Sequence, residues 1–139
     1  MKLYTYLNYG GNCREAFEFY ARHLGAKIVM MMNHGEQPDK YNVRPDWKDK
    51  ILHARLDIGE TVLLGADIPP DVWKPIRSAY LTLIVDSDEE AERLYALLSE
   101  GGEILMKMEK ETFFAHRFAM LRDRFGTSWM LLHERPMQG

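Results

Sequence analysis

The 139-residue chain has one cysteine, no long apolar run and no excess of positive charge. The lone Cys13 excludes an intrachain disulfide and is typical of a reducing compartment. A formal net charge of -3 provides no basic surface for nucleic acid, so we expect no nucleic-acid partner. No stretch reaches the roughly 20 apolar residues of a membrane span. Residues 1–5 lead directly into a strand-like pattern and lack a signal-peptide core, so we expect a cytoplasmic protein without a membrane partner.

The second half of the sequence repeats the first. Glu15 and Ala16 recur 75 positions later as Glu90 and Ala91, inside a second run of helical character. Each run follows a strand-like segment and ends at glycine. Two similar units in one small chain commonly pack about a pseudo-twofold axis and form a concave site.

Periodicity predicts an α+β fold of two modules, each of which runs strand, helix and three strands (βαβββ). We expect a single domain over 1–139, with module one at about 1–66, a proline-rich linker at about 67–78 and module two at about 79–139. The predicted strands are 2–9, 26–32, 51–58, 61–66, 79–85, 103–109, 113–121 and 127–134, and the predicted helices are 13–24 and 87–99.

Local signals define the helix ends. Asn12 is the expected N-cap of the first helix, with Glu15 as its capping-box partner, and Gly25 the expected terminator. Asp86 or Ser87 is expected to cap the second helix. Cys13 in the first turn is either a thiol activated by the helix dipole or a small packed residue, and packing is the favoured interpretation.

The segment 51–58 alternates in polarity, as a half-buried strand does. One face is expected to carry Leu52, Ala54, Leu56 and Ile58, and the other His53, Arg55 and Asp57.

Three motifs then identify a family resemblance. They are residues 6–20 with Gly11-Asn12-Cys13-Arg14-Glu15-Ala16, residues 47–54 beginning at Trp47, and residues 116–130 with Asp123-Arg124-Phe125-Gly126. Together with the paired modules, they resemble the PhnB-like group of the vicinal oxygen chelate superfamily, which includes glyoxalases and bleomycin-resistance proteins. The resemblance implies that the two pseudo-symmetric modules form a curved mixed sheet with helices outside. Labels in this group that name a methyltransferase have no support here, because no glycine-rich nucleotide loop follows a strand.

The resemblance has a chemical consequence. Metal-using members place His or Glu on the first and last strands of each module, and these positions fall here on Thr5, Leu64 (or Gly65), Tyr80 and Met130. None is a usual His or carboxylate ligand, so the resemblance implies no metal and no cofactor. The same positions are expected to line a sheet cavity that suits a small organic molecule. Trp129 alternates with Met130, so it is expected to point toward a helix, in the core.

His53 is the main candidate for chemistry, with Arg55 beside it on the polar face and His116 at the matching place in module two. Either the two histidines line the cavity as acid–base groups or donors to an anionic ligand, or they are structural or solvent-facing residues. His116 departs from the family pattern, which more often carries Asp there.

Three functional hypotheses remain open. The leading one is a metal-independent homodimer that binds a small organic ligand, either sequestering it or acting on it through His53. The second is a metal-dependent lyase or dioxygenase with atypical ligands such as His53 and His116. The third is a dimeric interaction module without a ligand. The long loop 33–49, with Tyr41, Arg44 and Trp47, is expected to cover the cavity or reach a second subunit.

Overall fold

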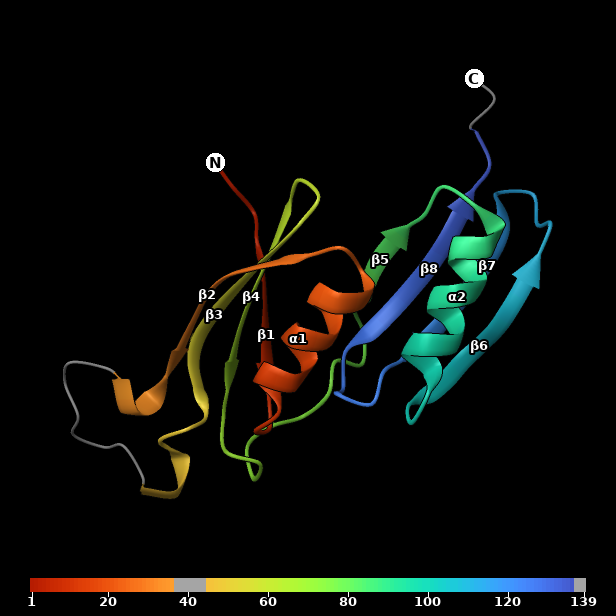
Figure 1. Ribbon diagram of the computed structural model, residues 1–139. Helices are drawn as coiled ribbons and strands as arrows, with labels where there is room; N and C mark the ends of the chain where they lie inside the picture. The colour runs from red at the N-terminus through yellow and green to blue at the C-terminus, as the bar shows by residue number, and fades with distance from the viewer. Residues whose placement is uncertain (37–44, 137–139) are drawn as a thin grey trace. The chain divides into compact units, whose positions relative to one another are not determined.

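The chain folds as two compact units, Met1–Lys74 and Pro75–Gly139. The computed structural model describes residues 1–36 and 45–136. Each unit runs strand, helix and three strands, which confirms the α+β class and the internal repeat (Figure 1). Each unit forms its own four-stranded mixed sheet.

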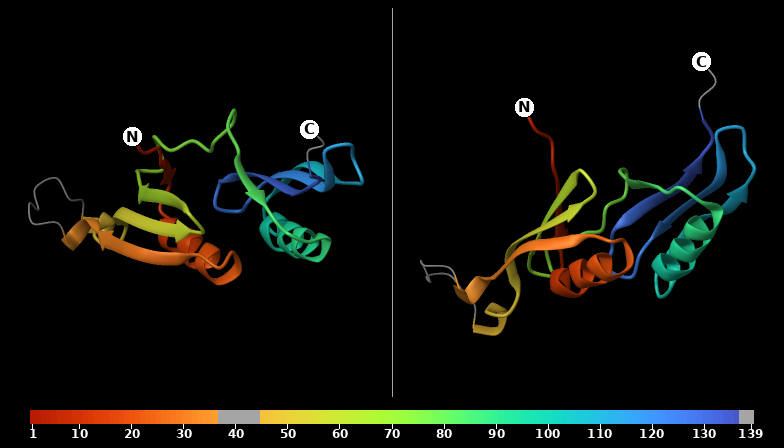
Figure 2. Two further views of the ribbon diagram at one scale, coloured as in Figure 1. Left: turned by 90° about the horizontal axis from the view of Figure 1, so that it is seen from above. Right: turned by 45° about the horizontal axis from the view of Figure 1, so that its top comes forward.

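Unit 1 has strand order β1-β4-β3-β2, with β1 and β4 parallel and the other pairs antiparallel. Helix α1 lies along one face of this sheet (Figure 2). Its elements are β1 (Thr5–Tyr9), α1 (Cys13–His23), β2 (Lys27–Asn33), the 3-10 turns η1 (His34–Glu36) and η2 (Pro45–Trp47), β3 (Ile51–Ile58) and β4 (Thr61–Asp67).

Unit 2 has the equivalent order β5-β8-β7-β6, again with its first and last strands parallel. Its elements are β5 (Leu81–Ile84), α2 (Asp88–Ser99), β6 (Glu103–Lys110), β7 (Ala115–Arg122) and β8 (Ser128–Glu134). The strands predicted at 2–9 and 79–85 are shorter than expected, because pairing with β4 and β8 begins only at Thr5 and Leu81.

The core of unit 1 lies between α1 and the sheet. Ala54 and Leu56 of β3 are fully buried, as the alternation predicts. The prediction for Leu52 is wrong: a register shift between Met32 and Asn33 bulges β3 there, and Ile51 is buried instead. A bulge moves side chains between faces without changing the residue pattern, so alternation alone does not reveal it.

Gly65 marks the closest approach of α1 to β4. A Cβ at this position would lie 2.7 Å from the ring of Phe17 and 3.2 Å from the Cys13 sulfur. Cys13 itself is fully buried. Burial, and then the nearby Asp67 carboxylate, raise the pKa of its thiol far above the usual range. The packing interpretation of Cys13 therefore agrees with its surroundings.

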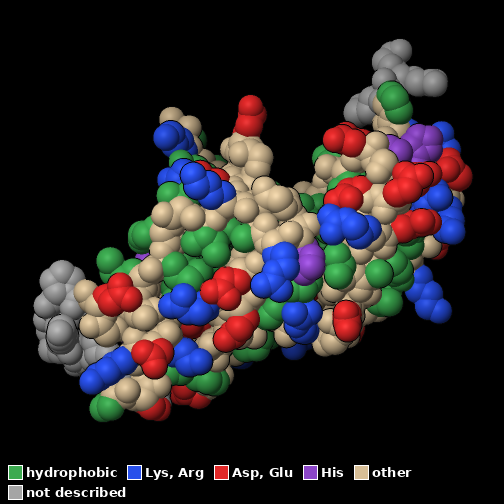
Figure 3. Space-filling view, viewed as in Figure 1, with side chains coloured by type: hydrophobic (Ala, Val, Ile, Leu, Met, Phe, Trp, Pro, Cys, Tyr) green, Lys and Arg blue, Asp and Glu red, His purple; other side chains and the backbone are tan. Residues whose placement is uncertain are grey.

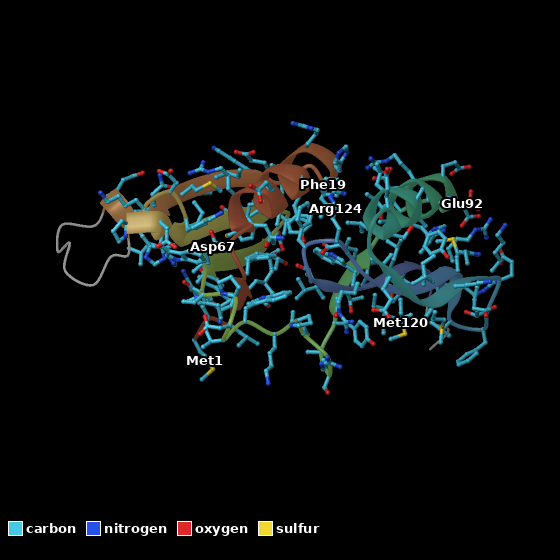
Figure 4. The ribbon with its side chains drawn as sticks, turned by 90° about the horizontal axis from the view of Figure 1, so that it is seen from below. Met1, Phe19, Asp67, Glu92, Met120 and Arg124 are labelled. Atoms are coloured by element: carbon cyan, nitrogen blue, oxygen red, sulfur yellow. The ribbon has the colours of Figure 1, made fainter. Side chains whose placement is uncertain are left out.

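A distant carboxylate holds the start of α1. Asn12 occupies the N-cap position, but its side chain makes no capping hydrogen bond, so the predicted capping box is wrong. Instead, Asp67 accepts the backbone N–H groups of Gly11 at 3.0 Å, Cys13 at 2.9 Å and Ile51 at 2.8 Å. Asp67 lies inside unit 1 beside the first turn of α1 (Figure 4). At α2, by contrast, the Ser87 hydroxyl accepts the Glu90 N–H at 3.1 Å, as predicted.

A second buried carboxylate organises the turn before β8. Asp123 accepts the backbone N–H groups of Phe125 and Thr127, each at 3.0 Å, and the indole N–H of Trp129 at 2.8 Å. Trp129 is 2% exposed, which confirms its predicted core position. Gly126 has a φ of +99°, a conformation that explains the glycine in this turn.

The segment predicted as a linker is partly built into unit 1. Asp67 still belongs to β4, and the Trp73 indole N–H donates to the Asn8 carbonyl at 2.7 Å. The division between the units falls between Lys74 and Pro75, within 67–78. In the described part of the chain, no helix is both long and apolar enough to cross a membrane.

Candidate functional site

Unit 1 has one face of its sheet packed on α1 and, among the described residues, no helix on the other. Strand register assigns side chains to that second face, because residues directly opposite each other on paired strands share a face. Tyr6 is opposite Leu64, Leu64 is opposite Arg55, and His53 is opposite Met32. We call this set, Tyr6, Met32, His53, Arg55 and Leu64, the open face of unit 1.

Tyr6 and His53 form a contact pair on the open face. The Tyr6 hydroxyl oxygen lies 3.3 Å from His53 Nδ1, and the two rings stack with centroids 5.8 Å apart and planes at 27°. Partial burial, and then the charge of Cys13, raise the pKa of the Tyr6 phenol. The phenol therefore stays protonated near neutral pH and can donate to Nδ1. In the neutral tautomer that accepts this bond, the single imidazole N–H is at Nε2, where it can donate to a ligand.

Arg55 lies on the same face as His53, as alternation predicts, but its charge is engaged. Its Nε donates to Asp57 at 2.8 Å, and its guanidinium lies 5.7 Å from the centre of the Tyr4 ring. These residues, with Lys2 and Leu3, line a cavity of about 450 Å³ beside the open face. Because Asp57 already neutralises Arg55, the guanidinium is a weaker anion site than its sequence position suggests.

Thr5 lies on the other side of the sheet from His53. Leu7 and Tyr9 are buried, and the Tyr9 ring packs edge-on against Phe17 of α1. Since strand residues alternate, Thr5 shares their face and its partner is the buried Leu63. Tyr6 takes the place expected for Thr5, opposite Leu64.

Unit 2 repeats the arrangement with other side chains. Met130 is opposite Thr82 and Met120, while its neighbours Trp129 and Leu131 are buried. Met130 therefore lies on the face away from the core of unit 2. Tyr80 immediately precedes β5 and is half-buried.

The residues at these positions do not fit the metal that metal-using members of the superfamily hold. Leu64 offers only hydrocarbon, Met130 offers a soft thioether, and Tyr6 is a phenol whose pKa is raised. In the segments that the structure describes, no group of three or more His, Cys, Asp or Glu is arranged to hold a metal ion.

His116 belongs to a different cluster, in unit 2. Its Nδ1 lies 3.1 Å from a Glu111 carboxylate oxygen, and its ring centre lies 4.8 Å from that of His133. His133 Nδ1 in turn lies 2.7 Å from the Asp88 carboxylate. The hydrogen bond with His133 is the main cause that lowers the pKa of Asp88. The hydrogen bond with His116 is likewise the main cause that lowers the pKa of Glu111.

Arg117 completes this cluster. It forms ion pairs of 3.3 Å with Asp88, Glu92 and Glu111. Histidine and charged side chains gather visibly on this part of unit 2 (Figure 3), and Glu92 projects from α2 (Figure 4). Sequence reasoning missed the cluster, because only the β7–β8 register brings His133 next to Arg117. The acidic first turn of α2 was the available signal.

The loop expected to cover the site is described only at its ends. Tyr41 and Arg44 lie outside the described residues. Trp47 lies in η2, with its ring centre 6.5 Å from that of His34. Lys50 then joins the end of this segment to the connection between β1 and α1 by donating to the Gly11 carbonyl at 2.8 Å.

Comparisons with known proteins agree with this architecture. The family model of the glyoxalase/bleomycin resistance protein/dioxygenase superfamily matches residues 5–131. Protein YjdN of Escherichia coli is 33% identical, covering 99% of this chain and 100% of YjdN. Protein PA1353 from Pseudomonas aeruginosa is 42% identical with a TM-score of 0.84, covering 95% of this chain and 96% of the other.

A PhnB protein from Bacillus cereus, described as a putative 3-demethylubiquinone-9 3-methyltransferase, has a TM-score of 0.80. It is 22% identical over 95% of this chain and 98% of its own, so it supports the fold alone. The family resemblance carried by the sequence motifs is thus confirmed, and this chain belongs to the glyoxalase/bleomycin resistance protein/dioxygenase superfamily.

Proposed function

We propose that this protein binds a small organic molecule on the open face of unit 1, at the Tyr6–His53 pair, without a metal. The observation that carries the proposal is the hydrogen-bonded, stacked pair on the sheet face of unit 1 that α1 does not cover. Tyr6 remains 48% exposed, so an aromatic ring and its polar partner are both accessible to a ligand. Apolar surface with a few convergent polar groups is typical of small-molecule sites.

The surroundings of the pair favour a ligand with an apolar body and a hydrogen-bond acceptor. Leu64 and Met32, opposite Tyr6 and His53, supply apolar contact. The Nε2–H of His53 can donate to a carbonyl or carboxylate oxygen of the ligand. A neutral imidazole can also exchange a proton with a bound molecule, so a reaction at this site would be a proton transfer through His53. Sequestration of the ligand needs no such step.

The proposal includes a homodimer, as the family resemblance implies, and a cytoplasmic location, which the single cysteine favours. Light scattering on the purified protein measures the mass of the particle directly. A particle of twice the 16.3 kDa chain mass supports this part, and a monomer at working concentration contradicts it.

Thermal denaturation against a library of small carboxylates and carbonyl compounds tests the binding site. A ligand at 100 times its dissociation constant stabilises the folded state by about 2.7 kcal/mol. We expect compounds that stabilise the wild type to stabilise Tyr6→Phe less and His53→Phe least, since the latter keeps a ring but loses both nitrogens. Tyr95→Phe on α2 makes the same chemical change as Tyr6→Phe in the other unit and should respond like the wild type.

Two outcomes contradict the proposal. One is a library in which no compound raises the melting temperature. The other is a set of stabilising compounds whose effect is the same in the wild type, Tyr6→Phe and His53→Phe.

A further inference from the structure

Unit 2 contains a cavity that the proposed function does not use. Its volume is about 990 Å³, at the upper end of the range for small-molecule sites. It lies where the turn between β6 and β7 meets the end of β8, and its walls include Phe113, Phe114, Leu132 and Glu134.

Aromatic rings form much of this wall and lie unusually open to solvent. Phe113 is 92% exposed and Phe114 is 39% exposed. Their ring centres are 5.1 Å apart in an edge-on arrangement, and Phe114 packs edge-on against Phe118 at 5.0 Å. The contact with Phe118 therefore fixes the position of the Phe114 ring. Ring faces carry negative electrostatic potential and attract organic cations.

Two carboxylates in the wall of the cavity differ in their ion pairs. Glu111 contacts His116, Arg117 and Arg135, so cations of the protein already surround its carboxylate. Arg135 also donates from Nε to the Thr112 carbonyl at 2.7 Å. The carboxylate of Glu134, by contrast, makes no hydrogen bond or ion pair with any residue of 1–36 or 45–136. The cavity thus combines open aromatic rings with one uncompensated carboxylate.

We propose that this cavity is a binding site for a hydrophobic organic cation, with Phe113 and Phe114 contacting its apolar groups and Glu134 balancing its charge. An anion of the same shape would be repelled by the Glu134 carboxylate and by the negative potential of the ring faces. A neutral analogue would lose the electrostatic part of the attraction. The site is independent of the Tyr6–His53 pair, which belongs to unit 1.

Tetraphenylphosphonium and tetraphenylborate provide matched probes, since they share a shape and carry opposite charges. Isothermal titration of the full chain should show saturable binding of the phosphonium and at least tenfold weaker binding of the borate. Rising salt concentration should weaken the phosphonium interaction, because the Glu134 carboxylate is accessible to solvent.

Variants assign the binding to this cavity. Glu134→Gln keeps the shape and removes the charge, and Phe113→Leu keeps an apolar side chain and removes the ring. Each should weaken phosphonium binding about threefold to fivefold. Glu109→Gln removes an exposed carboxylate of β6 outside the cavity and should leave the affinity unchanged. Phe113 is almost fully exposed, so its replacement does not disturb the fold.

The proposal fails if the borate binds as tightly as the phosphonium, if the phosphonium does not saturate, or if both variants keep the wild-type affinity. Tyr6→Phe should bind the phosphonium like the wild type. Loss of phosphonium binding in that variant would place the cation at the other site and overturn this assignment.

Discussion

Asp67 and Cys13 are separated by 54 positions in the sequence, yet an oxygen of the Asp67 carboxylate accepts the Cys13 backbone N–H at 2.9 Å. Through the same carboxylate, the end of β4 is joined to the start of α1 and to the first residue of β3. A negative charge at this point also complements the positive end of the α1 dipole. Three segments of unit 1 therefore depend on one buried side chain.

Replacing Asp67 should destabilise the protein strongly. Asp67→Ala leaves three backbone donors without their acceptor, two of them buried, and we expect a loss of at least about 2 kcal/mol in the free energy of unfolding. Asp67→Asn, which keeps one acceptor oxygen, should lose less. Urea denaturation measures both, with the exposed Asp71→Asn as a control that should change little. Equal stability of Asp67→Ala and the control would contradict this account of α1.

Gly65 should tolerate no larger side chain. The methyl group of Gly65→Ala would meet the Phe17 ring at 2.7 Å, and overpacking of this kind costs about 1 to 3 kcal/mol. The double variant with Phe17→Leu should show a favourable coupling, because the smaller side chain relieves the clash. Strictly additive destabilisation in a double-mutant cycle would show that α1 does not press on β4 at this point.

Cys13 should react slowly with thiol reagents in the folded protein. Its pKa is raised by burial and by Asp67, so the thiolate fraction at pH 8 is far smaller than that of an ordinary cysteine. The rate of labelling by a disulfide reagent should rise steeply in denaturing urea. Fast labelling without denaturant, at the rate of a small-molecule thiol, would contradict the packed position of Cys13.

Asp88 and Glu111 should make the stability fall in acid. Their pKa values are lowered in the folded state, so their contribution is present above the unfolded values, 3.8 and 4.5, and is lost as the pH falls through the lower folded values. Denaturation midpoints measured from pH 6 to pH 2.5 should therefore decline less in Asp88→Asn than in the wild type. If the midpoints of Asp88→Asn and the wild type fell equally with pH, the His133–Asp88 contact would not be the cause of the acid sensitivity.

The sequence predicted elements whose signals are local. The bounds of β3, the core position of Trp129 and the Ser87 cap all depend on neighbouring residues, and the structure confirms them. The sequence did not predict which side chain accepts the backbone N–H groups at the start of α1, because Asp67 lies at the end of β4, far from α1 along the chain. It assigned Thr5 to the wrong face for a related reason, since only pairing with β4 fixes the register of β1.

The candidate site was predicted in part. His53 and Arg55 were placed on a common polar face by alternation within one strand. Asp57, the partner of Arg55, is on the same strand. Tyr6, the partner of His53, comes from β1 and reaches His53 only across β4. The grouping of His116 with His133 likewise depends on pairing between β7 and β8, which no short motif encodes.

Metal content tests the proposed metal-free site most directly. The measurement is elemental analysis of protein purified without a chelator or a histidine tag, followed by titration with zinc, nickel, iron and manganese. We predict far less than one metal per chain and no saturable binding, because Tyr6, Leu64 and Met130 are each poor metal donors. Near-stoichiometric metal, or a titration that saturates at one ion per chain, would contradict this account and favour a metal-dependent lyase or dioxygenase.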